Sequence, residues 1–190
     1  MLMGITRMKF KLLASSALVF SLTLTVIPSS VEATPVVSST KVAQASTQIT
    51  EANVQSVVKQ LQAARVSEDI EGTLKLLAPF AVTDVTVQTG NGITTVITHL
   101  EGTAAHRQML EQSFGKVQSR KVLKNYVTIN IISNDFGMAK IYQIENLETQ
   151  DGKSFVAASE TILRLGRVDG QVLITSATVE GWISERPSQK

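Results

Sequence analysis

The chain contains no cysteine, and its tryptophan, tyrosine, histidine and proline residues are few. Among 190 residues there are one tryptophan, two tyrosines, two histidines and four prolines. Without cysteine there can be no disulfide, no zinc–thiolate site, no iron–sulfur cluster and no cysteine nucleophile. The composition is 43% apolar and 18% charged, which excludes a disordered or collagen-like chain. This length favours one domain with a sizeable core.

The first 33 residues have the three parts of a secretory signal. Lys9 and Lys11 precede a nearly uncharged apolar stretch over residues 12–27, and small residues follow near Ala33. The stretch is short for a membrane span, although an uncleaved anchor is the alternative. A second small-residue site ends at Ala45, and the start is Met1 or Met8. We therefore expect a protein that is exported to the periplasm or the extracellular space.

The formal charge of +2 belongs to this signal. Residues 1–33 hold three cations and one anion, which leaves 15 of each in the remainder. A nucleic-acid-binding domain normally has an excess of basic residues. We therefore expect no nucleic-acid partner, and no stable membrane span once the signal is cleaved. Residues 34–48 have no sustained period and are expected to form a flexible leader, and residues 186–190 a tail.

Residues 49–185 are expected to form one α+β domain. Thr50 can cap a helix with an apolar stripe, and Ser67 can cap a second helix that Pro79 ends. The second helix would place Ile70, Leu74 and Leu77 on its inner face. A third helix is expected over residues 102–114. These stripes need a partner, so the helices should cover one face of a sheet.

Strand patterns occupy the rest of the domain. Residues 82–88 and 93–98 flank the turn sequence Gly90-Asn91-Gly92 and predict a hairpin. Turn sequences then separate four further strand-like segments, at residues 122–133, 138–147, 155–165 and 172–183. The pattern predicts a curved, mostly antiparallel sheet of about six strands.

The order of these elements resembles the nuclear transport factor 2-like superfamily, a cone-shaped α+β fold with SnoaL-like and steroid-isomerase-like members. Short segments agree over roughly residues 49–185: Ser67–Leu74, Leu77–Val82, Leu100–Ala105 and the final hairpin around Asp169-Gly170. The family often has an aromatic residue after that Asp-Gly, whereas this chain has Gln171 and Val172. These motifs concern the fold, and none is a catalytic signature.

The resemblance implies a conical pocket between sheet and helices. Steroid-isomerase-like members place an Asp base and a Tyr/acid pair of oxyanion donors there, since a poorly solvated carboxylate gains basicity. The candidates in this chain are Asp84, Tyr126, Tyr142 and Glu160. The alternative is that Asp84 is solvated and Tyr142 belongs to the core with its hydroxyl at the rim. A full set of base and donors cannot be aligned.

No motif indicates a cofactor or a metal. His99 and His106 are seven residues apart, but His99 is expected at a strand end, and Glu101 suits a helix start without any metal. There is no Gly-x-Ser-x-Gly motif and no glycine-rich phosphate loop followed by a helix. We therefore expect neither a metal site nor a cofactor site.

Both faces of the predicted sheet carry large apolar residues, which favours self-association. Ile129, Ile131 and Ile141 alternate with a second set made of Tyr126, Ile132, Tyr142 and Ile144. The function expected is an exported, non-catalytic domain that binds a small apolar ligand or a protein partner, as a homodimer through the sheet. The alternatives are an isomerase or cyclase-type enzyme that uses a pocket acid/base, and a structural part of the cell envelope.

Overall fold

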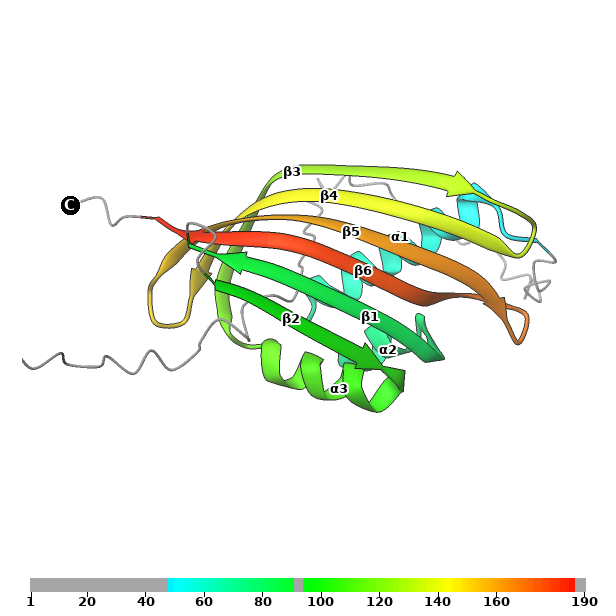
Figure 1. Cartoon of the computed structure of the whole chain (residues 1–190), viewed down its shortest axis with the longest axis horizontal. Coiled ribbons are helices and arrows are strands. Elements are labelled where there is room, and N and C mark those ends of the chain that lie inside the picture. Colours follow the sequence, from blue (N-terminus) through cyan, green and yellow to red (C-terminus); the bar gives the residue numbers. More distant parts are fainter. Residues whose placement is uncertain (1–47, 91–93, 187–190) are drawn as a thin grey trace, which may run out of the picture.

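The computed structural model describes residues 48–90 and 94–186. The predicted export signal, nearly all of the leader, part of the Gly90-Asn91-Gly92 turn and most of the tail lie outside the described residues. Within these ranges the elements follow in the order α1 (Glu51–Val66), α2 (Ile70–Leu74), β1 (Leu77–Thr89), β2 (Thr94–Glu101), α3 (Gly102–Ser113), β3 (Val117–Ile131), β4 (Phe136–Thr149), β5 (Ser154–Val168) and β6 (Gln171–Glu185) (Figure 1).

The described strands form one six-stranded sheet in the order β2-β1-β6-β5-β4-β3. Strands β3 to β6 make the predicted antiparallel meander, and β1 pairs with β2 as the predicted hairpin. The first and last strands, β1 and β6, run parallel. The sheet is therefore mostly antiparallel, which confirms the α+β fold expected from the sequence.

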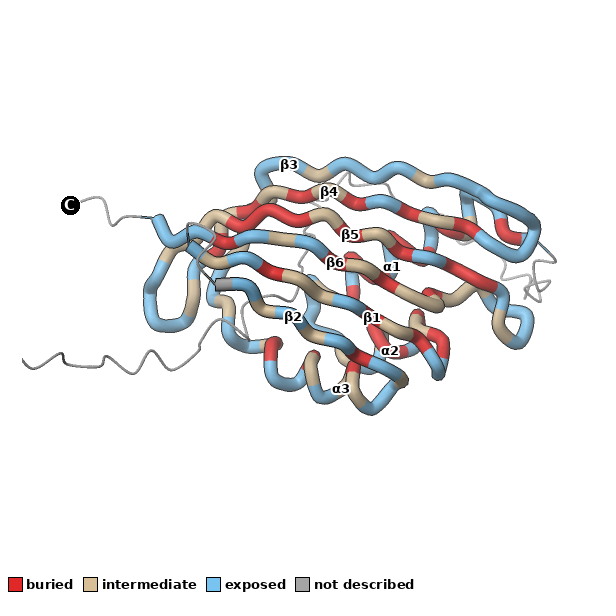
Figure 2. Tube along the Cα trace, viewed as in Figure 1, coloured by how far each residue is buried: buried red, intermediate tan, exposed pale blue. Residues whose placement is uncertain are grey.

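All the described helices lie on the concave face of the sheet (Figure 1). Helix α1 packs against β3, β4 and β6, while α3 packs against β1 and β2. On β4 the burial alternates strictly, so every second side chain points toward the helices (Figure 2). Edge strand β3 is far more exposed than β4 or β5. The face under the helices is therefore the one that can enclose a site.

The apolar stripe of α1 closes one end of this concave face. The Thr50 hydroxyl accepts a hydrogen bond from the Asn53 N–H at 3.3 Å and caps the helix, and the Ile49 N–H donates to the Asn134 carbonyl at 2.7 Å. The stripe packs on the sheet in a buried cluster that contains Ile49, Val54, Val57, Val58, Leu61, Ala139, Ile141, Leu163, Leu165, Ile174 and Ala177. Full burial of each large side chain stabilises the fold by about 1.5–3 kcal/mol.

The second helix begins later in the sequence and ends earlier than predicted. Ser67 does not cap α2; its hydroxyl donates to the Ala63 carbonyl at 3.0 Å and closes α1. Glu68 then has a φ of 54°, which turns the chain, and the Asp69 side chain caps α2. Helix α2 ends at Leu74, so Leu77 and Pro79 belong to β1. Pro79 is accepted there because it lies within a register irregularity between Leu77 and Val82.

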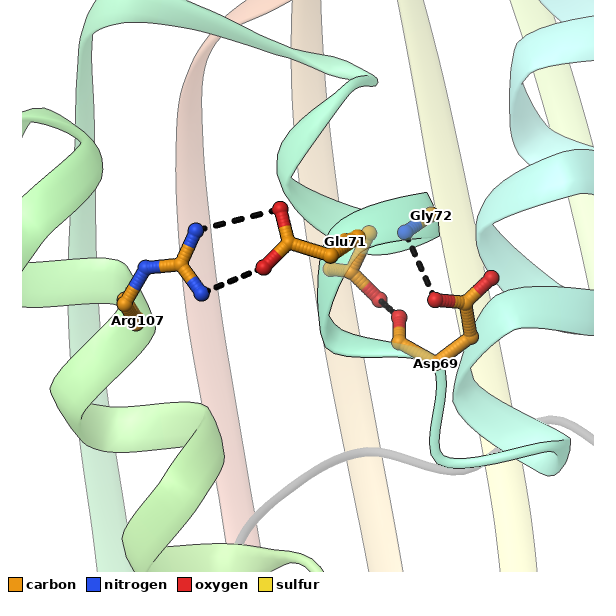
Figure 3. A network of polar contacts seen from close by, with 5 residues as sticks. Asp69, Glu71, Gly72 and Arg107 are labelled. Atoms are coloured by element: carbon orange, nitrogen blue, oxygen red, sulfur yellow. Dashed lines mark hydrogen bonds and ion pairs between the residues drawn. The ribbon is translucent and has the colours of Figure 1, made fainter.

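The Asp69 cap explains the glycine inside α2. The Gly72 N–H donates to Asp69 Oδ1 at 2.8 Å (Figure 3). A β-carbon at position 72 would come within 2.2 Å of Asp69 Oδ2, so any other residue would displace the cap. Glycine lowers helix propensity, but here it leaves room for the hydrogen bond that starts the helix.

We expect Asp69→Ala to lower the free energy of unfolding by about 1 kcal/mol, because the first turn of α2 loses its cap. Asp69→Asn should lower the free energy of unfolding by only about a few tenths of a kcal/mol, since an amide oxygen caps a helix nearly as well as a carboxylate oxygen. Urea unfolding at constant m value measures both. Equal losses for the two variants would show that the carboxylate charge, and not the cap, stabilises this turn.

Candidate functional site

A cavity of about 70 Å³ lies between the helices and the concave face of the sheet. Its walls come from α1, α2 and α3 and from β1, β4, β5 and β6, and they are mainly apolar. The polar side chains in the wall are Gln62, Arg65, Thr73, Thr83, His106 and Thr161, and all of them except Arg65 are buried. Such a lining, apolar with a few placed polar groups, is typical of small-molecule sites.

His106 is held in a fixed orientation in this wall. It is 4% exposed, and its Nδ1–H donates to the Gly102 carbonyl at 2.7 Å. Its Nε2 is therefore the acceptor in the neutral ring, and it accepts from the Thr83 hydroxyl at 2.8 Å. Gly102 makes this possible with a φ of 73°, a conformation that favours glycine, at the entry to α3. His106 thus joins α3 to β1 at the cavity.

A band of buried polar side chains crosses the concave face beside the cavity. It consists of Gln143 and Glu145 on β4 and Ser159 and Thr161 on β5, and we name it the polar belt. The β4–β5 register places Gln143 directly opposite Ser159. Toward the start of α1 the belt borders the large apolar cluster, and on its other side a second cluster includes Val87, Leu147, Ala157 and Ile183. Polar groups therefore lie in the middle of an otherwise apolar face.

Glu145 is the central charged group of the belt. It is 5% exposed, and its Oε2 accepts a hydrogen bond from Gln143 Nε2 at 3.0 Å. Arg120 Nη1 of β3 lies 3.9 Å from Glu145 Oε1. Burial raises the pKa of the Glu145 carboxyl to about 7, although the attraction of Arg120 and Arg65 lowers it in part. This carboxyl therefore changes its charge near neutral pH.

Two arginines share this buried region. Burial and repulsion by Arg120 lower the pKa of Arg65 to about 10, while Glu145 raises it in part. Burial likewise lowers the pKa of Arg120, which Glu145 and Glu68 oppose. Both guanidinium groups stay charged at neutral pH. Protonation of Glu145 therefore makes the net charge of the region beside the cavity more positive.

Two polar contacts fix the positions of the helices over the cavity. Arg107 of α3 donates from Nη1 and Nη2 to the two carboxylate oxygens of Glu71 on α2, at 2.5 and 3.1 Å (Figure 3). This hydrogen bonding lowers the pKa of Glu71. The Glu68 carboxylate accepts from the Gly115 N–H at 3.0 Å and joins the α1–α2 turn to the α3–β3 turn. The pair Arg107–Glu71 is exposed, so it orients the helices more than it stabilises the fold.

The four residues proposed from the sequence lie on the opposite, convex face of the sheet. Asp84 accepts a hydrogen bond from His99 Nδ1 at 2.7 Å, and Glu160 is paired with Lys140 Nζ at 2.8 Å. Tyr126 and Tyr142 stack with ring centroids 6.4 Å apart, and Tyr126 is 61% exposed. None of the four lines the cavity. The structure therefore does not bring Asp84 and a tyrosine together in the cone.

The sequence analysis missed Arg65, Arg120 and Glu145, and it considered His106 only as a metal ligand. The sequence contains a signal for Glu145: Ile141 is predicted on one face of its strand, and every second residue after it, Gln143 and then Glu145, lies on the same face. His99 and His106 lie on opposite sides of the sheet. Within residues 48–90 and 94–186 there is no group of three or more potential metal ligands. Among the described helices, none is long and apolar enough to cross a membrane.

We expect Glu145→Gln to flatten the pH dependence of stability. The pKa of Glu145 is raised in the folded state, so its stabilising contribution is complete below pH 4.5 and is lost as the pH rises through about 7. The loss is on the order of 3 kcal/mol for a shift of this size. Urea unfolding of wild type and variant from pH 5 to 8 measures the difference.

Glu148→Gln is the matched control, because Glu148 is an exposed carboxylate on the same strand. This variant should show the same dependence of the free energy of unfolding on pH as the wild type. Parallel profiles for wild type and Glu145→Gln would contradict the assignment of the raised pKa to Glu145.

No family model matches the chain, and no curated protein matches it by sequence. Solved structures do match its fold. A hexachlorocyclohexane dehydrochlorinase superposes with a TM-score of 0.58 at 10% identity, covering 73% of this chain and 89% of that one. A dehydrochlorinase of the same kind from Novosphingobium barchaimii gives 0.55 at 10% identity, over 73% and 90% of the two chains.

A ketosteroid isomerase-like protein from Erwinia carotovora atroseptica matches with a TM-score of 0.51 at 10% identity, covering 68% of this chain and 94% of that one. At these identities the similarity concerns the fold alone. The helices on one concave face and the order of the strands agree with the cone-shaped fold expected from the sequence. The chain therefore has the cone-shaped fold of the nuclear transport factor 2-like superfamily.

Proposed function

We propose that the chain binds a small molecule in the cone cavity. The observation that carries this proposal is the lining: a mainly apolar wall into which α1, α2, α3 and the sheet each contribute buried polar side chains. Buried polar groups are costly unless they form hydrogen bonds. A cavity that retains several of them beside apolar surface suits a ligand with an apolar part and a polar part.

The cavity volume limits the ligand. A buried apolar cavity of about 150 Å³ holds a benzene molecule. A volume of about 70 Å³ is half of that and takes roughly three to five non-hydrogen atoms. The bound group is therefore small, or it is the end of a larger molecule.

Filling the cavity should abolish binding. Ala177 lies in the wall on β6, so Ala177→Leu places three additional carbon atoms there. Ala63→Leu makes the same change on the exposed side of α1 and serves as the control. Native mass spectrometry of the protein purified from its own host measures the bound mass. We expect a ligand on wild type and on Ala63→Leu, and none on Ala177→Leu; equal ligand on all three would place the site elsewhere.

The same spectrum tests the export that the N-terminal sequence predicts. A mature mass that begins after Ala33 or Ala45, from protein outside the cytoplasm, supports export. A full-length chain retained in the cytoplasm contradicts it.

The second candidate function is an acid–base enzyme acting on such a ligand. Glu145 favours it: this carboxyl lies beside the cavity and not in its lining, and with a pKa of about 7 it can give and take a proton at neutral pH. Several matched structures carry enzyme names, among them the dehydrochlorinases. Conversion of the recovered ligand on incubation with fresh protein would favour the enzyme, and an unchanged ligand mass favours binding alone.

We also propose that the convex face of the sheet forms a homodimer. Tyr126, Ile97 and Trp182 are among its exposed large side chains. Exposed apolar surface of this kind often marks an interface. We expect light scattering at micromolar concentration to give a dimer, and Tyr126→Asp to give a monomer. Val66→Asp, at an exposed apolar residue that ends α1 on the helix side of the sheet, is the control, and a monomeric wild type would exclude this interface.

A further inference from the structure

We propose that the ligand of the cone cavity is a short-chain carboxylic acid whose carboxylate pairs with Arg65. The inference rests on the proposed function and names its ligand class. Arg65 is the one side chain in the wall that carries a full charge at every physiological pH. The remaining wall offers hydroxyls, an amide and the imidazole of His106, together with apolar surface. A small anion with an apolar part complements this combination.

The second arginine increases the attraction for an anion. Arg120 lies in the same buried region and is close enough to repel Arg65. Glu145 interacts with both guanidinium groups, so protonation of its carboxyl makes the net charge of this region more positive. Water screens such a charge poorly in a buried region, so an anion that reaches Arg65 gains more there than at the surface.

The geometry of the cavity favours a carboxylate. A guanidinium donates two parallel hydrogen bonds to the two oxygens of a carboxylate, and this pairing needs few other donors. The cavity volume of about 70 Å³ leaves space for a short alkyl chain against the apolar wall. Inorganic phosphate is more strongly hydrated and would need more donors than this mainly apolar lining provides.

Glu145 competes with the ligand for the arginines. The charged groups that act on Glu145 are Arg65 on α1 and Arg120 on β3, and Glu68 acts on Arg120 from the α1–α2 turn. Once ionised, Glu145 neutralises part of the charge that would attract a carboxylate. Acid binding should therefore weaken as the pH rises from 5.5 to 8, over which Glu145 ionises.

The test compares propionate with propionamide, which has nearly the same shape and no charge. Ligand-observed NMR titration gives both dissociation constants for the wild-type protein. We expect propionate to bind at least about tenfold more tightly at pH 5.5, the effect of one hydrogen bond to a charged group. Arg65→Met should remove this preference, and Arg65→Lys should retain part of it. Lys59→Met removes an exposed cation from the same helix and should leave the preference unchanged.

The Glu145→Gln variant provides a second test that does not remove Arg65. It should bind propionate more tightly than wild type at pH 8, where the wild-type carboxyl is ionised, and equally well at pH 5.5, where that carboxyl is mostly protonated. His106 is the same in both proteins, so the difference between them belongs to Glu145. Identical binding of the carboxylate by wild type and Glu145→Gln at pH 8 would show that Glu145 does not compete with the ligand.

The outcomes separate this inference from the proposed function. Equal binding of propionate and propionamide, or a preference that survives Arg65→Met, overturns the carboxylate ligand while the cavity remains a binding site. Absence of binding for both compounds, together with no ligand in the host-purified protein, overturns the proposed function itself.

Discussion

The structure depends on how two guanidinium groups and one carboxyl are accommodated on the concave face of the sheet. Arg65 reaches this region from the last turn of α1, Arg120 from β3 and Glu145 from β4. Buried charges are tolerated only when they are paired or can become neutral. Burial raises the pKa of Glu145 to about 7, so this carboxyl is partly protonated at neutral pH. Apolar clusters on both sides of the polar belt keep water away and so cause this shift.

The cavity follows from the same arrangement. Strands β4 and β5 change from apolar to polar side chains where α1 ends, so tight apolar packing stops there. Helices α2 and α3 cover the opening, and the Asp69 cap, the Arg107–Glu71 pair and the His106 hydrogen bonds fix their positions. The site therefore depends on short polar contacts between helices that bury little apolar surface of their own. The fold supplies the cone, and the choice of polar residues inside it decides what can bind.

The sequence predicted the architecture well, because apolar periodicity and turn residues act locally. It placed Ile141 and Tyr142 on opposite faces of one strand, as observed, but it did not say which of the two faces the helices cover. The sequence did not reveal the site. The alternation along β1 shows that Asp84 and Thr83 lie on opposite faces, but it does not show which face the helices cover. The α2 cap was misplaced for a similar reason: Ser67 and Asp69 are both good caps, and only the turn at Glu68 decides between them. Arg65 and Arg120 are 55 residues apart in sequence, so no local pattern brings them together.

The pKa of the Glu145 side chain tests this account most directly. Isotope labelling of glutamate and an NMR titration of its carboxyl carbons, with Glu145→Gln to assign the resonance, measure it residue by residue. The account predicts a midpoint of about 7, well above that of the exposed glutamates. A midpoint at the ordinary value of about 4.3 would contradict it, because the carboxyl would then be ionised and would neutralise the arginines at every pH near neutrality.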